Sequence, residues 1–504
     1  MSDPALTNIE LARLSTFVQE RIGLYFPPEK YDDLRRSIAL ISSERGFISQ
    51  SACLAWILST HLDRSLIEML SASLTVGETY FFREPDVFQV FEDQILPTLI
   101  SKRWKQGRIL RIWSAACSTG EEAYTLAILV SKIVPEIDTW SITILGTDIN
   151  PQAIKTAETG IYREWSFRSI PSSIKDRFFQ RLSDGRYQIG DTIRNLVTFS
   201  YLNLGEDTYP SLLTNTNAMD LIFCRNVLMY FSKETIQETI DKLQKCLVPD
   251  GRMITSMTET MLVQNKHLAP DVTNGFTTYQ KVDMPESGIV AVPPMSVLLS
   301  SRDVRDLNSG QPMERGEPDP IVPVQGSDAY SDIPTAEKID EYSTATRLFE
   351  SGDYTTAERT LMPFIAQNPA DHRSMALMAQ ILANQGDLPG AHAWCDKAII
   401  LDKLNPFYHH ILAIILQEKG EVEAATKELR RVLYADPSYI PAHFTLAHLK
   451  HRQGKEKESE VHVQNIRELL RNLRPDEIIP GTGGMSAGYL EQNMRIIIEE
   501  EHYS

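Results

Sequence analysis

The chain has 504 residues, too many for one compact core, so at least two domains are expected. Hydrophobic residues make up 42% and charged residues 23%, an ordinary composition for a globular protein. The formal net charge of −17 excludes nucleic acid as a bulk electrostatic partner, because no basic excess is present to neutralise phosphates.

Targeting and metal signals are missing from the sequence. No apolar run approaches the roughly 20 residues that cross a bilayer, and the first 14 residues lack the basic and apolar segments of a signal peptide. The cysteines are scattered and form no C-x-x-C pair, so neither a disulfide framework nor a zinc site is indicated. We therefore expect a cytoplasmic protein that is not inserted in a membrane and holds no metal. The cysteines are Cys53, Cys117, Cys224, Cys246 and Cys395.

Residues 5–72 are expected to form an N-terminal helical domain. Apolar residues recur at three- and four-residue steps from Leu11 to Ile22 and again from Leu34 to Ile41. Pro27-Pro28 separates the two stretches, because proline interrupts a helix.

In residues 73–281 the sequence pattern changes to apolar strands that alternate with amphipathic helices. This alternation predicts an α/β domain with a parallel, doubly wound sheet. Asn150-Pro151 and Ser232 are typical of helix starts. The expected strands are 109–115, 142–147, 196–202, 220–224 and 252–257, and the expected helices lie near 121–134, 151–159 and 232–247.

The C-terminal half begins with a linker and continues with a repeat. Residues 282–336 carry eight prolines and one aromatic residue, a composition that cannot bury a core, so a disordered linker is expected. In residues 337–474 a glycine recurs every 34 residues, which is typical of an all-α tetratricopeptide solenoid. A helical bundle with chance glycine spacing is the alternative. The glycines are Gly352, Gly386, Gly420 and Gly454, and residues 475–504 form a tail without an assigned role.

A run of small residues links the first expected strand to its helix. Residues 114–120 read Ser-Ala-Ala-Cys-Ser-Thr-Gly, and the helix then opens with Glu121 and Glu122. Small residues let a ligand approach the backbone, but two acids at this end would repel a pyrophosphate. A cofactor with an ammonium and a sulfonium would be attracted. Alternatively, the two acids only stabilise the helix start.

Asp148 ends the second expected strand. An acid at this position typically binds ribose hydroxyls. The alternative is that Asp148 only caps the helix that follows Asn150. Together with the small-residue loop, Asp148 favours a nucleoside-containing cofactor.

Six motifs occur in order between residues 75 and 231. They are TVGETYFFRE (75–84), WSAACSTGEEAYTLA (113–127), TDI (147–149), TGIYR (159–163), VTFSYLNL (197–204) and DLIFCRNVLMYF (220–231). Through these motifs, residues 5–281 resemble the CheR chemoreceptor glutamate methyltransferases. The resemblance implies an N-terminal helical domain and a Rossmann-like catalytic domain with a small β-subdomain. It also implies S-adenosylmethionine as cofactor, no metal, and glutamate methyl ester and S-adenosylhomocysteine as products. Tetratricopeptide extensions occur in a known subgroup.

The resemblance also assigns site residues. Arg83 and Tyr230 are expected closest to the transferred methyl, with Arg83 also a cofactor contact, and Asp148 is expected at the ribose. Many members have asparagine where this chain has Gly77, so the backbone would have to supply that contact. From the residues alone, Tyr230 could be a core aromatic, and Arg83 could pair with a nearby acid. The remaining expected cofactor contacts are Thr79, Glu122 with Glu121 adjacent, Asn203 and Leu204 at the adenine, and Asn226 and Val227 in the cleft.

Partners follow from the same resemblance. The expected substrate is the cytoplasmic helical region of a methyl-accepting chemotaxis receptor, and the groove of the repeats is expected to bind a further protein. Residues 183–199 are compact, which suggests an enzyme that does not need a receptor's C-terminal tether. Arg35, Arg36 and Arg45 could face the acidic receptor helices or form a solvated face.

Two other functions remain open at this point. The same cofactor platform could methylate a small molecule or another protein. Alternatively, the catalytic domain could be degenerate, so that the chain would act as a signalling scaffold through its repeats.

Overall fold

The structure, a computed structural model, describes residues 6–59, 64–75, 77–273, 276–282, 341–482 and 484–498. The linker expected at 282–336 therefore lies almost wholly outside the described residues. The described residues on either side of that gap form one compact unit.

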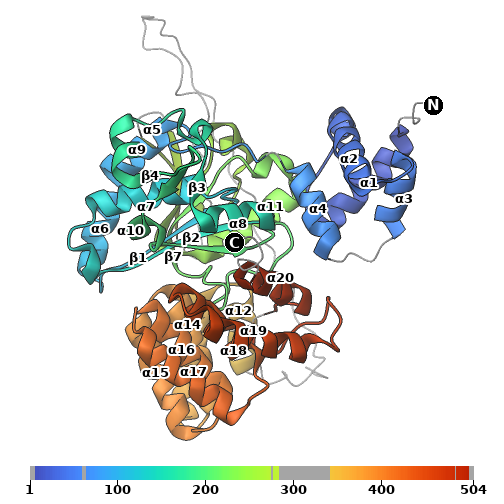
Figure 1. The fold of residues 1–504 in the computed structure, drawn as a ribbon. Helices are drawn as coiled ribbons and strands as arrows, with labels where there is room; N and C mark the ends of the chain where they lie inside the picture. Colours follow the sequence, from blue (N-terminus) through green and yellow to red (C-terminus); the bar gives the residue numbers. More distant parts are fainter. Residues whose placement is uncertain are drawn as a thin grey trace, which may run out of the picture. The chain divides into compact units, whose positions relative to one another are not determined.

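Four helices form the N-terminal part. Residues Leu11, Leu14, Val18 and Ile22 are fully buried on one side of α1, which confirms the predicted apolar stripe. Thr7 caps α1 in a reciprocal capping box with Glu10. The helices are α1 (Asn8–Ile22), α2 (Tyr31–Arg45), α3 (Gln50–Ser59) and α4 (Arg64–Leu74) (Figure 1).

A seven-stranded sheet carries the central domain, with strand order β6-β2-β1-β7-β8-β10-β9. The strands β6, β2, β1, β7 and β8 are parallel, and β10 runs antiparallel to β8 and β9. This confirms the predicted α/β domain. The bounds are β1 (Ile109–Ala115), β2 (Ser141–Asp148), β6 (Val197–Tyr201), β7 (Met219–Cys224), β8 (Leu247–Ile254), β9 (Leu268–Thr273) and β10 (Phe276–Lys281).

The last predicted strand differs from the structure at both ends. It was expected at 252–257, whereas β8 begins at Leu247 and ends at Ile254. Pro249-Asp250-Gly251, a sequence typical of turns, lies within the strand, where Asp250 has a φ of 63°. Ser256 ends the extended segment because it caps the 3-10 helix η6 (Met257–Leu262). The antiparallel pair β9 and β10 was not predicted.

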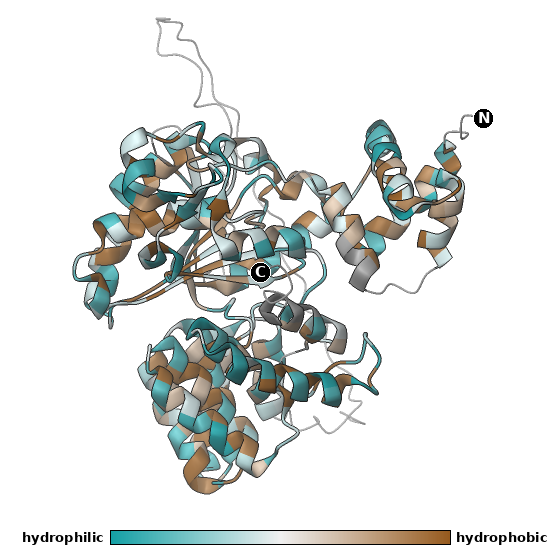
Figure 2. Ribbon diagram, in the orientation of Figure 1, coloured by the Kyte–Doolittle hydropathy of each residue, from teal (hydrophilic) through white to brown (hydrophobic). Residues whose placement is uncertain are grey.

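Helices cover both faces of the sheet, and hydrophobic residues concentrate on the strands and on the helix sides that meet them (Figure 2). Asn150 and Ser232 cap α8 and α11 with their side chains, as predicted. The helices are α5 (Pro85–Val90), the π-helix η2 (Phe91–Ile95), α6 (Leu96–Trp104), α7 (Glu121–Ile133), α8 (Pro151–Thr159) and α11 (Lys233–Cys246).

A second, three-stranded sheet is inserted between α8 and β6, and this is the small β-subdomain that the resemblance implied. Its strand order is β3-β5-β4, with antiparallel pairs throughout. The strands are β3 (Ile161–Tyr162), β4 (Phe179–Arg181) and β5 (Tyr187–Ile189), with α9 (Ser172–Phe178) and α10 (Asp191–Arg194) beside them.

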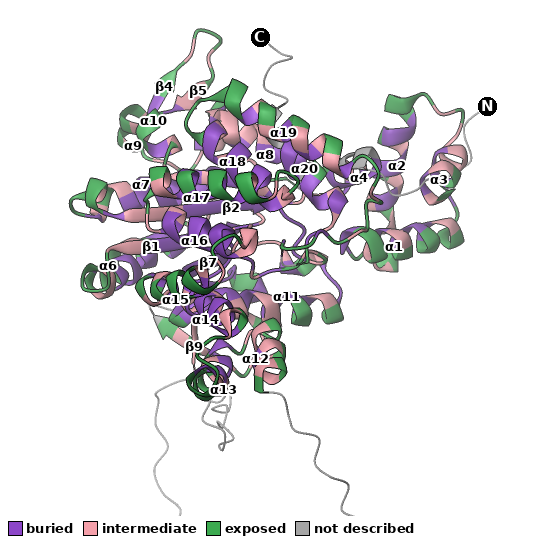
Figure 3. Cartoon of the chain, turned by 90° about the horizontal axis from the view of Figure 1, so that it is seen from below, coloured by how far each residue is buried: buried purple, intermediate pink, exposed green. Residues whose placement is uncertain are grey.

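Helix pairs with the predicted 34-residue period follow. Each of the four glycines lies in the turn after the first helix of a pair, with φ between 66° and 84°. Figure 3 shows that α14, α16 and α18 are largely buried. The helices are α12 (Glu341–Glu350), α13 (Tyr354–Gln367), α14 (His372–Gln385), α15 (Leu388–Leu401), α16 (Pro406–Glu418), α17 (Val422–Ala435), α18 (Ile440–Arg452) and α19 (Glu456–Leu470).

The C-terminal segment adds a further helix, α20 (Ala487–Ile498), in the region expected to be a tail. The Tyr489 hydroxyl donates to the carbonyl of Tyr201 at 3.2 Å, and the Ser200 hydroxyl donates to Asn493 at 2.8 Å. Helix α20 therefore lies against β6, the first strand of the sheet order.

Candidate active site

A cavity of about 780 Å³ lies at the carboxyl ends of β1, β2 and β7. Its wall includes residues 116–119 after β1, Asp148 at the end of β2, residues 202–204 after β6 and residues 225–227 after β7. The strand order reverses between β1 and β7, and ligands of open α/β sheets bind at such a point. The volume is in the range of small-molecule sites.

The turn after β1 is held in an uncommon backbone conformation. Ala116 and Ser118 have φ values of 62° and 50°, which residues with side chains rarely adopt. Gly120 has a φ of 89°, and a Cβ there would lie 2.7 Å from the Cβ of Ala157. The turn therefore needs glycine at Gly120 for the helix contact, and it directs backbone groups at the cavity.

Asp148 is nearly buried, with 8% of its surface exposed. Its Oδ2 accepts the N–H of Ser118 and its Oδ1 accepts the N–H of Asn150, both at 2.8 Å. Burial raises the pKa of this carboxyl, although the backbone hydrogen bonds oppose the rise. Each oxygen can accept a further hydrogen bond, as ribose hydroxyls require. Asn150 is the side-chain cap of α8, so Asp148 fixes the residue before the helix.

The two acids at the start of α7 have different surroundings. The Oε1 of Glu122 accepts the Ser114 hydroxyl at 2.7 Å, and Glu122 lines the cavity. Glu121 is 2% exposed and does not line it. Its carboxylate accepts the hydroxyls of Thr119 at 2.6 Å and Ser166 at 3.0 Å. Of the two acids, only Glu122 faces the cavity.

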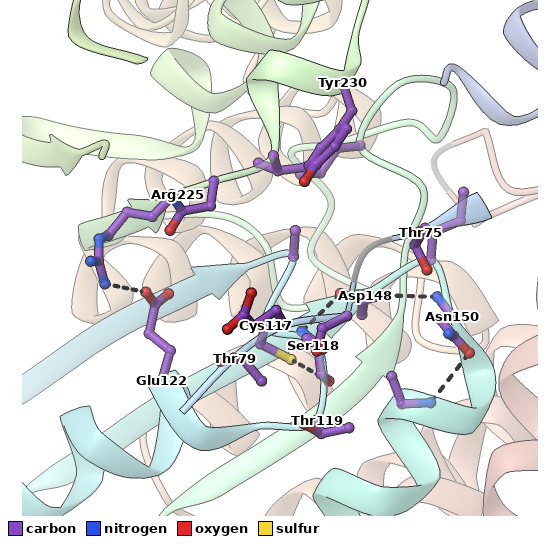
Figure 4. A pocket seen from close by; sticks show the side chains of 18 of the residues that line it. Thr75, Thr79, Cys117, Ser118, Thr119, Glu122, Asp148, Asn150, Arg225 and Tyr230 are labelled. Carbon is purple, nitrogen blue, oxygen red and sulfur yellow. Dashed lines mark hydrogen bonds and ion pairs between the residues drawn. The ribbon is translucent and has the colours of Figure 1, made fainter. Parts of the chain in front are cut away.

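Arg225 joins three parts of the wall, and the sequence analysis gave it no role. Its Nη1 donates to Glu122 at 2.7 Å (Figure 4). Its Nη2 lies 3.2 Å from Glu84 and donates to the Arg83 carbonyl at 2.9 Å. Its side chain is 1% exposed. The charge of Glu122 is therefore partly balanced within the protein. The signal was available in the FCRN motif, because a buried arginine needs carboxylate partners.

The segment before α5 contributes Gly77, Thr79 and Arg83 to the wall. The Arg83 Nη1 donates to the carbonyl of Glu78 at 2.6 Å, while the nearby acid Glu84 pairs with Arg225. The Arg83 side chain is partly exposed to the cavity.

The space around Gly77 does not require glycine at this position. A Cβ at this position would lie 3.6 Å from the Ser118 Oγ, an ordinary contact. The Gly77 carbonyl accepts the Ser118 hydroxyl at 3.4 Å, so its backbone already takes part in the wall.

Tyr230 lies across the cavity from the turn after β1, and its hydroxyl points inward (Figure 4). Burial raises the pKa of Tyr230, and the positive charge of Arg83 opposes this rise. Its carbonyl accepts the N–H of Tyr25 at 2.8 Å, and the Lys30 ammonium lies 5.4 Å from the ring centroid. The half-buried ring packs at the margin of the hydrophobic core and also lines the cavity.

Glu259 holds the loop that carries Tyr230, and sequence reasoning missed it. The carboxylate is 0% exposed. It accepts the N–H groups of Asn226 at 2.6 Å and Val227 at 2.7 Å, and the hydroxyl of Ser256 at 2.5 Å. The S-x-x-E spacing of Ser256 and Glu259 is a capping-box signal that could have indicated it.

Asn203 and Leu204 line the cavity after β6. The Asn203 side chain accepts the N–H of Gly205 at 3.0 Å, and the backbone N–H of Asn203 donates to the Asp207 carboxylate at 2.6 Å. Burial raises the pKa of Asp207 to about 7, with Glu206 contributing in the same direction.

The structure thus brings together every expected site residue except Glu121. Four carboxylates and two guanidiniums line the cavity, an excess of negative charge that fits a cationic ligand. S-adenosylmethionine, with its ammonium, sulfonium and ribose, suits this donor and acceptor set. The charged residues are Glu78, Glu84, Glu122, Asp148, Arg83 and Arg225.

Metal ligands and membrane-spanning helices can be assessed for the described residues only. Within these ranges no group of three or more histidine, cysteine, aspartate or glutamate side chains is placed to hold a metal ion. Among the helices that the structure describes, none is long and apolar enough to cross a membrane.

Residues 77–274 match the family model described as CheR methyltransferase, SAM binding domain. A chemotaxis protein methyltransferase of Borreliella burgdorferi is 29% identical, covering 51% of this chain and 89% of the relative. A probable chemotaxis protein methyltransferase of Rhizobium etli is 33% identical, covering 42% and 77%. A probable biofilm formation methyltransferase, WspC of Pseudomonas aeruginosa, is 26% identical, covering 76% and 81%.

Proposed function

The chain belongs to the CheR methyltransferase family and is an S-adenosylmethionine-dependent protein methyltransferase; on that premise we propose that it esterifies glutamate side chains of a methyl-accepting chemotaxis receptor. The products are glutamate 5-O-methyl ester and S-adenosylhomocysteine. The observation that carries the proposal is the acid-lined cavity that has Asp148 on one side and Tyr230 with Arg83 on the other.

The cofactor roles follow from the wall of the cavity. Asp148 binds the ribose hydroxyls, because its oxygens are fixed by backbone donors and keep acceptor capacity. Glu122 attracts the cationic amino-acid end. Asn203 and Leu204 border the adenine, while Asn226 and Val227 line the cleft between the two ends. Thr79 and the backbone of Gly77 complete the cofactor contacts. Glu121 acts only through the packing of the helix start.

The chemistry needs positioning more than proton transfer. S-adenosylmethionine supplies an activated methyl group. A glutamate carboxylate has a reference pKa of about 4.3, so it is ionised at neutral pH and needs no general base. Arg83 orients the carboxylate, and the Tyr230 hydroxyl directs the acceptor oxygen toward the methyl. The wall of the cavity excludes water from the reacting atoms and aligns them.

The substrate is tested by methyl transfer from a labelled donor to receptor-containing membranes. We expect label on the receptor that alkali releases, the behaviour of a carboxyl ester. Transfer of alkali-stable label, or label found only on small molecules, would contradict the glutamate assignment.

The scaffold alternative is tested separately by calorimetry with S-adenosylhomocysteine. Binding in the micromolar range supports an active cofactor site. A folded sample that shows no binding would favour the scaffold, in which the repeats alone carry the function.

The receptor contact is proposed to be independent of a C-terminal tether, because β4 and β5 are each three residues long and form a compact hairpin. Arg35 and Arg36 pair with Asp32 and Asp33 on their own helix, which favours the solvated-face alternative for them. A further protein partner is proposed for the repeats.

A further inference from the structure

The two helices of each repeat differ in how much of their surface is buried. In α14, ten of fourteen residues are buried, whereas α15, of the same length, buries only Leu388, Ala391, Cys395 and Ala398. The same contrast holds between α16 and α17. A helix at the surface of a solenoid buries one stripe. The first helices therefore have packing partners on a second side.

The turns after the first helices show what lies there. A Cβ on Gly352 would lie 2.6 Å from the Lys245 side chain, and one on Gly386 would lie 3.4 Å from Val248. A Cβ on Gly420 would lie 3.8 Å from the Ser141 hydroxyl. Three successive repeats thus contact residues of the catalytic domain. Gly454 has nothing within 4 Å at the same position.

These contacts follow the order of the strands. Lys245 precedes β8, Val248 lies near its start, and Ser141 begins β2. Along the sheet order the successive repeats therefore pass from β8 to β2, and the last helix reaches β6.

A buried ion pair lies in the middle of this row. The Glu418 carboxylate on α16 is 3.5 Å from the Nη1 of Arg111 on β1, and both side chains are 4% exposed. The Asn217 side chain donates to Glu418 at 3.3 Å, and the Ser141 hydroxyl donates to the Glu418 carbonyl at 2.8 Å. Burial raises the pKa of Glu418 while Arg111 and Asn217 oppose the rise. A carboxylate this deeply buried needs such partners.

Apolar contacts surround the ion pair. Ile109, the first residue of β1, and Leu212 pack against the hydrophobic core of the repeats. The contact therefore combines an apolar part with a charge pair that fixes one register.

We propose that the first helices of the repeats are a docking surface for this chain's own catalytic sheet. The part of the sheet that occupies it is the edge at which the strands begin, and Glu418 and Arg111 fix the register. This edge is opposite to the carboxyl ends that line the cavity, so docking leaves the methyl-transfer site open. A further protein that binds the repeats must displace this edge or use the second helices.

The test uses the full chain with a specific protease site placed within residues 284–340 and cut after folding. The two pieces of the wild-type chain are expected to co-elute in size-exclusion chromatography at the mass of one chain. Glu418→Lys places two cations together in a buried site, so the dissociation constant of the two pieces should rise roughly hundredfold. Val248→Asp, made on the catalytic side, should also separate them.

Glu423→Lys is the matched control, because it makes the same charge change at an exposed position of the next helix. Circular dichroism checks that the Glu418→Lys chain keeps its helices, and Val248→Asp provides an independent variant if it does not. The proposal is overturned if the wild-type pieces separate after cutting, if both interface variants co-elute as tightly as the control, or if the uncut chain elutes as a dimer that exchanges its repeats.

Discussion

The methyltransferase cavity and the repeats place left-handed backbone on different residues. Around the cavity, φ is positive at residues with side chains, among them Glu84, Ala116, Ser118 and Asn226. In the repeats, over the described part of 341–498, positive φ occurs at glycine alone. Left-handed backbone costs about 1 kcal/mol or more for a residue with a Cβ, and little for glycine.

This difference in backbone strain distinguishes a functional site from a regular repeat. Strained residues persist only when the surrounding structure fixes them, as Glu259 and Arg225 do here, and they concentrate at functional sites. The repeats use the same relaxed turn at each glycine, and the docking surface proposed for them lies on whole helices. Four experiments test this contrast.

The largest effect is expected from Arg83→Ala. Loss of the cation that orients the carboxylate should lower kcat by about a hundredfold or more, while affinity for S-adenosylhomocysteine stays within a few-fold. Initial rates with a receptor substrate and calorimetry measure the two quantities. Arg359→Ala, an exposed change in the repeats, should alter neither. Unchanged turnover in Arg83→Ala would refute the role given to this residue.

Glu259→Gln tests whether the strained loop needs its buried carboxylate. The amide keeps one acceptor oxygen and turns an NH₂ group toward backbone N–H donors, so Asn226 or Val227 loses a partner. We expect kcat to fall about ten- to a hundredfold. Glu238→Gln, exposed on α11, serves as control. A variant with wild-type kcat would show that the loop keeps its geometry without this anchor.

Asp207→Asn tests the carboxyl beside Asn203. Burial raises the pKa of Asp207 from 3.8 to about 7, so between these values the folded chain holds a proton that the unfolded chain has released. Wild-type stability should therefore fall as pH rises through this window and level off above about 7. A shift of about three units corresponds to roughly 4 kcal/mol, so the variant, which lacks this loss, should be more stable at pH 8 by up to that amount. Urea unfolding at pH 4 and pH 8 measures the difference; equal pH dependence in both chains would contradict the assignment.

The smallest effects come from a mirrored pair of substitutions. Gly454→Ala has open space around its Cβ but a φ of 66°, so it should lower the free energy of unfolding by about 1 kcal/mol through strain alone. Ala116→Gly relieves a φ of 62° and should raise stability by up to about 1 kcal/mol while slowing methyl transfer. Thermal unfolding and initial rates test both. If Ala116→Gly loses neither strain nor activity, the proposed contrast is wrong.

Periodicity and strand patterning predicted the fold well. β1 and α8 have the predicted bounds, and the phased glycines predicted the helix pairs, because each depends on local sequence. The prediction of β8 was wrong at its ends, since Leu247 and Arg252 both pair with β7 and the turn-like residues around Asp250 form an irregularity between them.

The sequence predicted site residues only where they belong to a recognisable motif. The sequence indicated Asp148 and Glu122 by their positions at a strand end and a helix start. It could not distinguish the surroundings of Glu121 from those of Glu122, because the two differ by where Ser166 and Arg225 lie in space. Glu259 was missed for the same reason: its partners at Asn226 and Val227 are more than thirty residues away in sequence.

Helix α20 also bears on solubility. β6 ends the hydrogen-bonded order of the main sheet, and an open outer strand is a template for pairing with other chains. Tyr489 and Asn493 attach α20 beside that strand. A chain shortened before Ala487 would uncover it and should self-associate with increasing concentration, which light scattering would reveal. On this prediction, the last described helix limits self-association because it covers the outermost strand of the sheet.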